Sequence, residues 1–362
     1  MKILVIHSIG WGDTNRESAV DLWRCARPIQ ELSKHVNWEI EAQPTFIRGI
    51  EKYKDNKEFT EEELEKAAEF LGSFDIVFSS YFADHTPYTL MKVVTARYGT
   101  KFVLDVDDDL FHVNPDNPFW TKVEHQNVWW MQNMVKDVAY LSTTTERLAN
   151  TFRERRDQPA DTVTVLPNLM SDDYQHPPMD NGEWTVIGYF DGASHFYDLN
   201  DTGVMKAISR LMHKHKKLRF KVLNMPIAHY IPTMRYDYVD GKRGTPWVTE
   251  VFPTLNMDIA IIPVIDNIFN YGKSNIKWME STRAGAATVC SDVGPYTDLP
   301  DDVTIKVHNT EDEWYEALEK LVVDAEYRRK LVADATTELY KWQLEDNWML
   351  YKDFFQKVYD GK

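Results

Sequence analysis

Cysteine is scarce in this 362-residue sequence, in which only Cys25 and Cys290 occur. Both lie in apolar surroundings, so the sequence supports neither a disulfide framework nor a metal site built from cysteines. Apolar runs stay far below the roughly 20 residues that a membrane-spanning helix needs. The N-terminal segment Met1–Ile6 has the character of a strand and not of a signal peptide. We therefore expect a cytoplasmic protein with no membrane span.

Low-complexity sequence is absent too, and 43% hydrophobic and 27% charged residues are typical of a folded globular protein. The length is sufficient for two domains, each with its own core. The formal net charge of −16 works against broad attraction to nucleic acid or anionic lipid, although a local basic groove is compatible with it.

The full glycine fingerprint of a dinucleotide site is also missing. A strand from Lys2 to His7 ends in a turn that contains Gly10 and Gly12, and a helix over residues 18–33 follows, but no third glycine completes the pattern. Strand, glycine turn and helix open an α/β domain whose ligand lies at the carboxyl end of the strand. Gly10 and Gly12 are therefore candidates for close approach to a ligand, with an ordinary tight turn as the competing explanation.

Apolar strands alternate with helical patterns along the rest of the chain, which implies an α/β protein with parallel sheets. We expect strands at 74–81, 101–105, 138–142, 162–168, 185–190, 219–223, 259–264 and 287–290. Helices are expected at 88–98, after Thr143–Thr145, at 205–215, before Leu255, and at 311–321, 325–341 and 342–359. Prolines and a glycine mark a linker. The expected parts are an N-terminal domain at 1–170, a linker at 171–183, a C-terminal domain at 184–340 and a last helix at 341–362.

Four carboxylates lie at the end of the strand that closes at residue 105, namely Asp105, Asp107, Asp108 and Asp109. Because like charges repel one another unless they are solvated, protonated or paired, the cluster has an energetic cost that suggests a use. Three uses compete: contact with a sugar or an acceptor, a metal site that bridges a diphosphate, and an acidic helix start in a solvated loop.

The segment between the strands 259–264 and 287–290 carries the strongest signal. One helix is expected there, with Ser274 as its N-cap candidate. Its first turn offers free N–H groups and the positive end of the helix dipole beside Lys273, which together suit a phosphate. Glu280, deeper in the helix, is placed to accept hydrogen bonds from a ribose. The alternative is a surface helix with an ordinary cap.

The same residues resemble a known family. The pattern FN-x-x-KSN-x-K-x-x-E, followed by SDVGPY at residues 291–296, is similar to the donor-site segment of group 1 glycosyltransferases. These are mostly retaining enzymes with the GT-B fold that use nucleotide sugars, and the family includes bacterial and tailed-phage members. Residues 185–199 resemble the segment of the same family in which a glycine turn faces the sugar diphosphate.

The resemblance implies a fold, a donor site and a cofactor requirement. The fold would be two Rossmann-like domains facing each other across a cleft, with the last helix crossing back to the first domain. The donor-binding candidates are Gly10, Gly12, Gly192, His195, Trp247, Val248, Lys273, Ser274, Asn275, Lys277 and Glu280. Because the family normally works without a metal, no cofactor is expected beyond the nucleotide-sugar substrate, although a divalent metal stays open.

The implied activity is transfer of a hexose or pentose to an acceptor hydroxyl, with retention of configuration inferred from the family alone. The catalytic candidates are Asp107 and Asp108 as base or acceptor contact, followed by His85 and His112. The acceptor is open among a glycan, a small molecule and hydroxymethylated pyrimidines of bacteriophage DNA. For such DNA modification, Arg153, Arg155 and Arg156 or the basic run at Lys214 would flank the nucleic acid. A nucleotide-sugar epimerase and a non-catalytic sugar-nucleotide binder are two further functions compatible with the same donor site.

Overall fold

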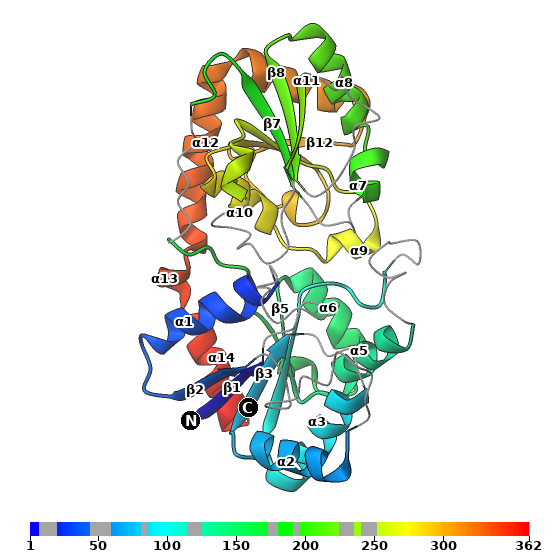
Figure 1. The fold of residues 1–362 in the computed structure, drawn as a ribbon, viewed down its shortest axis with the longest axis vertical. Coiled ribbons are helices and arrows are strands. Elements are labelled where there is room, and N and C mark those ends of the chain that lie inside the picture. The colour runs from blue at the N-terminus through cyan, green and yellow to red at the C-terminus, as the bar shows by residue number, and fades with distance from the viewer. Residues whose placement is uncertain are drawn as a thin grey trace. The chain divides into compact units, whose positions relative to one another are not determined.

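The computed structural model describes residues 1–6, 20–43, 59–80, 85–113, 125–172, 180–190, 196–223, 235–239 and 252–361. The chain forms two compact units (Figure 1). The first contains Met1–Val113, Trp120–Leu169 and Leu344–Lys362, and the second is built from Met170–Gln343. The chain therefore leaves the first unit after Leu169 and returns to it at Leu344.

The first unit is a parallel sheet with the strand order β2-β1-β3-β4-β5-β6. Its strands are β1 (Lys2–Ile6), β2 (Glu39–Gln43), β3 (Ile76–Ser80), β4 (Lys101–Val106), β5 (Tyr140–Thr143) and β6 (Val163–Val165). Its helices are η1 (Asp21–Ala26, a π-helix), α1 (Arg27–Ser33), α2 (Glu61–Gly72), α3 (His85–Tyr98), α5 (His125–Asp137), α6 (Glu146–Arg155), the 3₁₀ turn η3 (Ala160–Thr162), α13 (Leu344–Asn347) and α14 (Met349–Asp360). The strand that sequence predicted at 162–168 is shorter than expected and ends at Val165.

Helices cover both faces of this sheet because successive strand residues point to opposite sides. Leu4 and Leu104 pack in a cluster with apolar residues of α2, α3, α5 and α6. Their neighbours Ile3 and Val103 pack in a second cluster with residues of α1 and α14. Strands buried on both faces need nearly continuous apolar sequence, which explains why β1, β3 and β4 are recognisable from sequence alone.

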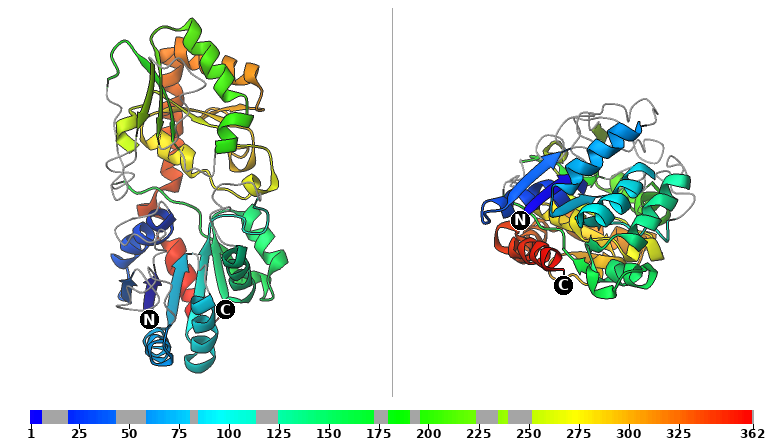
Figure 2. Two further views of the ribbon diagram at one scale, coloured as in Figure 1. Left: turned by 45° about the vertical axis from the view of Figure 1, so that its right-hand side comes forward. Right: turned by 90° about the horizontal axis from the view of Figure 1, so that it is seen from below.

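The C-terminal helix α14 belongs to the first unit (Figure 2). Tyr351, Phe354, Phe355 and Val358 are buried on its inner face, and the ring of Phe355 meets that of Phe78 edge-on with centroids 5.4 Å apart. The single helix predicted over 342–359 is wrong in detail. A 3₁₀ turn η10 (Tyr340–Trp342) and the short α13 precede α14, which starts only at Met349.

The second unit is also a parallel sheet, with the strand order β12-β11-β10-β7-β8-β9. Its strands are β7 (Thr185–Phe190), β8 (Leu218–Leu223), β9 (Tyr236–Val239), β10 (Ile259–Ile262), β11 (Ala287–Ser291) and β12 (Ile305–Val307). Its helices are α7 (Phe196–Asp201), α8 (Val204–Lys214), the 3₁₀ turn η8 (Phe252–Leu255), α9 (Ile268–Tyr271), α10 (Ile276–Arg283), the 3₁₀ turn η9 (Gly294–Tyr296), α11 (Glu311–Val323) and α12 (Ala325–Leu339). The two six-stranded units confirm the expected α/β architecture.

Three strands, β2, β9 and β12, are not predicted by the sequence analysis. Each lies at an edge of its sheet, where one side of the strand is unpaired and charged residues are tolerated. The alternating polar residues of Glu39–Gln43 therefore hide the strand signal. None of the described helices combines the length and hydropathy needed to cross a membrane.

Candidate functional site

The order of the strands locates a candidate ligand-binding point in the second unit. In the second unit the chain winds outward from β7 to β9 in one direction and from β10 to β12 in the other, so the direction reverses between β7 and β10. Open α/β sheets bind ligands outside the carboxyl ends of the strands at such a reversal. β10 leads directly into the segment of α9 and α10, where the donor-binding candidates are concentrated.

This segment folds as two short helices, so the expectation of one helix is wrong. α9 ends at Tyr271 and α10 begins at Ile276. The N-cap of α10 is Asn275 and not Ser274, and its side chain does not cap the described N–H groups of the helix. The first turn of α10 starts at Ile276, with Lys273 and Ser274 in the turn just before it, and the N–H groups of a helix start are the ones that can bind an anion.

Asp198 of α7 organises the segment, a role that the sequence analysis did not assign. Its Oδ1 accepts the N–H of Ile265 at 2.8 Å and the Nδ2 of Asn270 at 3.2 Å. Asn270 also donates from Nδ2 to the carbonyl of Ile265 at 2.9 Å. Burial raises the pKa of Asp198, while the hydrogen bond from Ile265 and the positive charges of Lys277 and Lys273 oppose the rise.

Two residues of the SDVGPY stretch hold the same segment from the β11 side. Ser291 accepts the N–H of Val264 at 2.8 Å and donates to Asn309 Oδ1 at 2.6 Å. Gly294 has φ +60, and a Cβ there would lie 2.5 Å from the carbonyl oxygen of Asn270. Only glycine fits this close approach at a positive φ. The stretch therefore serves as a scaffold for the residues after β10.

The charged candidates of the segment differ in environment. Lys273 is half-buried, with Nζ 4.7 Å from the ring centroid of Phe269. Lys277 is half-buried as well, whereas Glu280 is only 7% exposed on the inner side of α10. Trp278 and Met279, next to it, are fully buried and anchor the helix to the core. A carboxylate buried at this depth is unusual in a plain surface helix.

The remaining donor-binding candidates lie outside the described residues. They are Gly10, Gly12, Gly192, His195, Trp247 and Val248. Their predicted roles stay predictions.

The acidic cluster of the first unit separates into two pairs. Asp105 is buried in the core, where Arg24 of η1 binds both of its oxygens, Nε to Oδ1 at 2.8 Å and Nη2 to Oδ2 at 2.7 Å. Ser142 donates to Oδ2 at 2.6 Å. Burial alone would lower the pKa of Arg24, but the charge of Asp105 raises it. Asp105 is therefore one half of a structural ion pair with Arg24 and not a carboxylate of a ligand site.

Asp109 is the second carboxylate of the acidic cluster that is buried inside the first unit. Its Oδ1 accepts the N–H of Phe111 at 3.0 Å, and its Oδ2 lies 2.7 Å from Nδ1 of His112. Nε2 of the same histidine lies 3.2 Å from Nη2 of Arg155, which can only donate. The tautomer that fits both contacts donates from Nδ1 to Asp109 and accepts at Nε2 from Arg155. Both nitrogens of His112 are engaged within the chain, which makes this residue a weaker candidate for proton transfer than the sequence suggests.

Asp107 and Asp108 follow the carboxyl end of β4, and both side chains are half-buried. The last catalytic candidate, His85, is exposed in the first turn of α3, which follows the neighbouring strand β3. Its ring meets that of Trp130 edge-on at 4.9 Å, and its Nε2 lies 3.2 Å from the Thr89 hydroxyl. The structure thus brings three of the four catalytic candidates into one acidic turn and places His85 at the adjacent strand end.

Within the described part of the chain, no three His, Cys, Asp or Glu side chains are arranged to hold a metal ion. Asp105 and Asp109 are held by Arg24 and His112, so two of the four carboxylates already serve the fold.

The basic residues considered for a nucleic-acid path have intramolecular roles. Arg156 is buried and donates to the carbonyls of Val135 and Val138, each at 2.7 Å, and burial lowers its pKa to about 10. Arg153 pairs with Glu146, and Lys214 pairs with Glu319. The expectation that Arg156 flanks DNA is therefore wrong.

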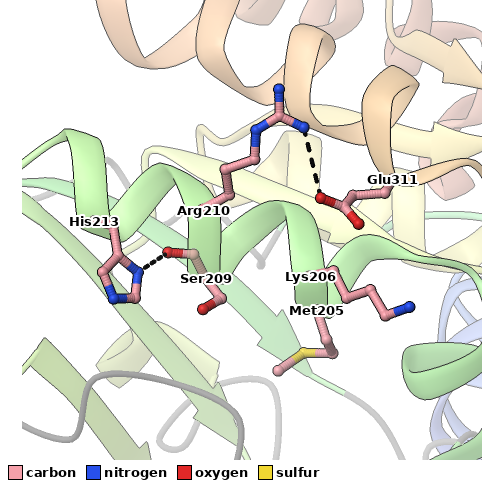
Figure 3. Close-up of a pocket in the computed structure, with 6 residues that line it drawn as sticks. All are labelled: Met205, Lys206, Ser209, Arg210, His213 and Glu311. Carbon is pink, nitrogen blue, oxygen red and sulfur yellow. Dashed lines mark hydrogen bonds and ion pairs between the residues drawn. The ribbon is translucent and has the colours of Figure 1, made fainter.

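A hollow in the second unit lies beside α8 and the start of α11 (Figure 3). It is lined by Met205, Lys206, Ser209, Arg210, His213 and Glu311. Arg210 contacts Glu311 at 3.5 Å and Asp312 at 2.7 Å, and its guanidinium stacks 3.9 Å from the Tyr315 ring centroid. Since the charge of Arg210 is already paired with two carboxylates, the hollow has the character of a solvated helix surface.

Comparison with known proteins defines the class of fold. No protein-family model and no curated protein sequence matches the chain. Among solved structures, sucrose-phosphate synthase from Thermosynechococcus elongatus matches over 100% of both chains with a TM-score of 0.68 at 9% identity. HepE from Anabaena in complex with UDP-glucose matches over 99% of both chains with a TM-score of 0.65 at 9% identity.

A third match is the UDP-GlcNAc 2-epimerase from Neisseria meningitidis bound to UDP-GlcNAc, with a TM-score of 0.56 at 12% identity over 99% of this chain and 100% of that chain. The protein therefore has the fold of the GT-B glycosyltransferases, as the resemblance in its sequence implies.

Proposed function

We propose that the protein is a glycosyltransferase that moves a sugar from a nucleotide-sugar donor to an acceptor hydroxyl. The observation that carries the proposal is the segment after β10. At the reversal point of the second sheet, Asp198 holds a turn that places Lys273 and the start of α10 together. A helix start beside a lysine suits a diphosphate leaving group.

In this proposal each unit has its own role. The second unit binds the donor, with Glu280 accepting from the ribose and Lys273 and Lys277 stabilising charge on the leaving diphosphate. The first unit supplies the acceptor side through Asp107 and Asp108. UDP-glucose is the first donor to test, with UDP as the bare nucleotide, because a structural neighbour has been solved with each of them. Retention of configuration is the expectation from the family resemblance.

The test is nucleotide-sugar binding by calorimetry, with Lys273→Ala and Glu280→Gln as the variants. Each loses a charge-assisted contact, so affinity for the preferred donor falls roughly ten- to a hundredfold. Lys330→Ala is the matched control, since Lys330 is 70% exposed and pairs with Asp334 on α12. Unchanged donor affinity in both site variants, with melting temperatures near that of wild type, would overturn the assignment of the donor site.

A nucleotide-sugar epimerase is the second candidate, because an epimerase with the same fold is among the structural matches. Incubation with a nucleotide sugar in the absence of acceptor separates the two. An epimerase converts the donor into a second nucleotide sugar, whereas a transferase releases at most the nucleotide and the free sugar.

A further inference from the structure

Three consecutive threonines join β5 to α6, and the structure gives them different roles. Thr143 donates from Oγ1 to the carbonyl of Val106 at 2.6 Å, which ties β5 to β4. Thr145 is the N-cap of α6 and accepts the N–H of Leu148 at 3.2 Å. Thr144, between them, is 3% exposed, and its Oγ1 is buried without a hydrogen-bond partner among the described residues.

A buried hydroxyl without a partner is costly, because it has given up its hydrogen bonds to water and gained none in return. Buried polar groups are almost always bonded to protein or to water. A valine has nearly the same shape and would avoid the cost. The hydroxyl of Thr144 therefore calls for a partner, and a bound ligand can supply it.

The place of Thr144 in the sheet indicates what that partner is part of. β4 and β5 pair in parallel with Val106 opposite Thr143, so the next residues on the two strands are Asp107 and Thr144. Both stand at the carboxyl edge, where open α/β sheets bind their ligands. Among the other buried groups without partners in the described parts of the chain, Gln43 stands at the carboxyl end of the outermost strand β2 and Asp292 follows β11 in the second unit, so neither is next to the acidic turn after β4.

The chemistry at this edge selects a neutral hydroxyl group. A threonine hydroxyl both donates and accepts, whereas the carboxylate of Asp107 only accepts. The start of α6 beside Thr144 favours an anion, but the Asp107 charge at the same edge opposes one. A ligand alcohol can donate to Asp107 and complete the hydrogen bonds of Thr144 at once.

We propose that Thr144 is a specificity-determining residue that hydrogen-bonds a sugar hydroxyl at the carboxyl ends of β4 and β5, next to Asp107. The inference rests on the proposed function. The hydroxyl belongs either to an acceptor sugar or to the sugar moiety of the donor, and the experiment distinguishes the two.

The experiment compares Thr144→Val with wild type by titration calorimetry against two sets of probes. The first set is the methyl glycosides of common hexoses, and the second is nucleotide sugars, each measured beside its bare nucleotide, such as UDP-glucose beside UDP. Thr144→Ser is the rescue variant. Thr145→Ala is the matched control, because it removes a neighbouring hydroxyl that has a structural role.

We expect Thr144→Val to weaken binding of the sugar probe at least about fivefold, the effect of one lost hydrogen bond. Thr144→Ser retains the wild-type affinity, and the melting temperature of Thr144→Val is no lower than that of wild type. Thr145→Ala shows the reverse, with a lower melting temperature and unchanged affinity. Weakened binding of a methyl glycoside assigns the hydroxyl to the acceptor, and loss of the difference between UDP-glucose and UDP assigns it to the donor.

Wild-type affinity of Thr144→Val for every sugar probe would overturn the inference and leave the proposed function standing, since a water molecule would then be the partner of Thr144. The inference also fails if wild type binds the bare nucleotide, binds no nucleotide sugar more tightly than that nucleotide, and binds no methyl glycoside. If wild type binds neither nucleotides nor sugars, the proposed function itself fails.

Discussion

Arg24 and Asp105 form a two-pronged ion pair in the interior of the first unit, and each side chain is 1% exposed. Nη1 of Arg24 also donates to the carbonyl of Leu166 at 2.6 Å and to Asn168 Oδ1 at 3.1 Å. The pair thereby joins η1, β4 and the segment after β6. Each guanidinium nitrogen of Arg24 has an acceptor, so the two buried charges are stable together, whereas either charge alone would be buried without a counter-ion.

The first prediction concerns this pair. Asp105→Asn leaves the charge of Arg24 buried without its counter-ion, so we expect it to lower the free energy of unfolding by about 3–5 kcal/mol. Arg24→Met costs a similar amount, and the double variant Arg24→Met with Asp105→Leu loses less than the sum of the two single changes. Chemical denaturation followed by tryptophan fluorescence measures all three. Additive losses in the double variant would show that the two residues are not coupled.

The pair also shows where prediction from sequence reaches its limit. The acidic cluster is visible in the sequence, but the partner of Asp105 lies 81 residues away, in the helix η1. The one available signal was an arginine within the apolar run of residues 22–26. A close look at Arg24 would have raised the question of its counter-ion.

The secondary structure shows the same difference between features set by local sequence and features set by distant residues. Strands β1, β3, β4, β10 and β11 are predictable because parallel strands buried on both faces need continuous apolar sequence. The break between α9 and α10 is not, because it depends on Asp198 and Gly294, which reach Asn270 from distant parts of the chain. The motif marks the segment that follows β10, while the geometry of that segment comes from long-range contacts.

The second prediction compares two glycines at positive φ. Gly294→Ala places a methyl group 2.5 Å from the Asn270 carbonyl, whereas a methyl group on Gly99, at φ +73, would meet no described atom within 4 Å. Gly99→Ala therefore costs only the left-handed conformation, about 1–2 kcal/mol. Gly294→Ala adds overpacking and exceeds that loss by at least about 1 kcal/mol. It also weakens nucleotide binding, because Asn270 must shift. Equal losses of unfolding free energy in the two variants, measured by chemical denaturation, would contradict the close approach.

The third prediction concerns acid stability. Hydrogen bonds from Lys214 and then from His215 hold the pKa of Glu319 at about 2, below its ordinary value of 4.5. A carboxyl group with a lowered folded-state pKa stabilises the fold above its unfolded-state pKa and loses that contribution as the pH falls through the folded value. The stabilisation by Glu319 is therefore complete above about pH 4.5 and is lost between pH 4.5 and pH 2.

We expect Glu319→Gln to lower the melting temperature at pH 6 and to match wild type near pH 2. The effect at pH 6 corresponds to no more than about 1 kcal/mol, because the network is partly exposed. Glu316→Gln, an exposed position on the same helix, is the control for the loss of one carboxylate. A difference between Glu319→Gln and wild type that stays constant from pH 6 to pH 2 would rule out the ion-pair explanation.

The last prediction tests the role of the two half-buried carboxylates in the acidic turn. Asp105 and Asp109 serve the fold, whereas Asp107 and Asp108 are the members of the cluster that we assign to the substrate. Asp108→Asn is then expected to lower transfer at least about tenfold, the scale of a lost base or acceptor contact, while affinity for the nucleotide is kept. Excess EDTA is expected to leave transfer nearly unchanged, because the proposed function assigns stabilisation of the leaving diphosphate to Lys273 and the start of α10 and not to a metal. If a divalent cation bridged these carboxylates and the diphosphate, EDTA would abolish transfer and Mg²⁺ or Mn²⁺ would restore it, since the leaving group would lose its main charge partner. That result would move the stabilisation of the leaving group from the second unit to the acidic turn of the first.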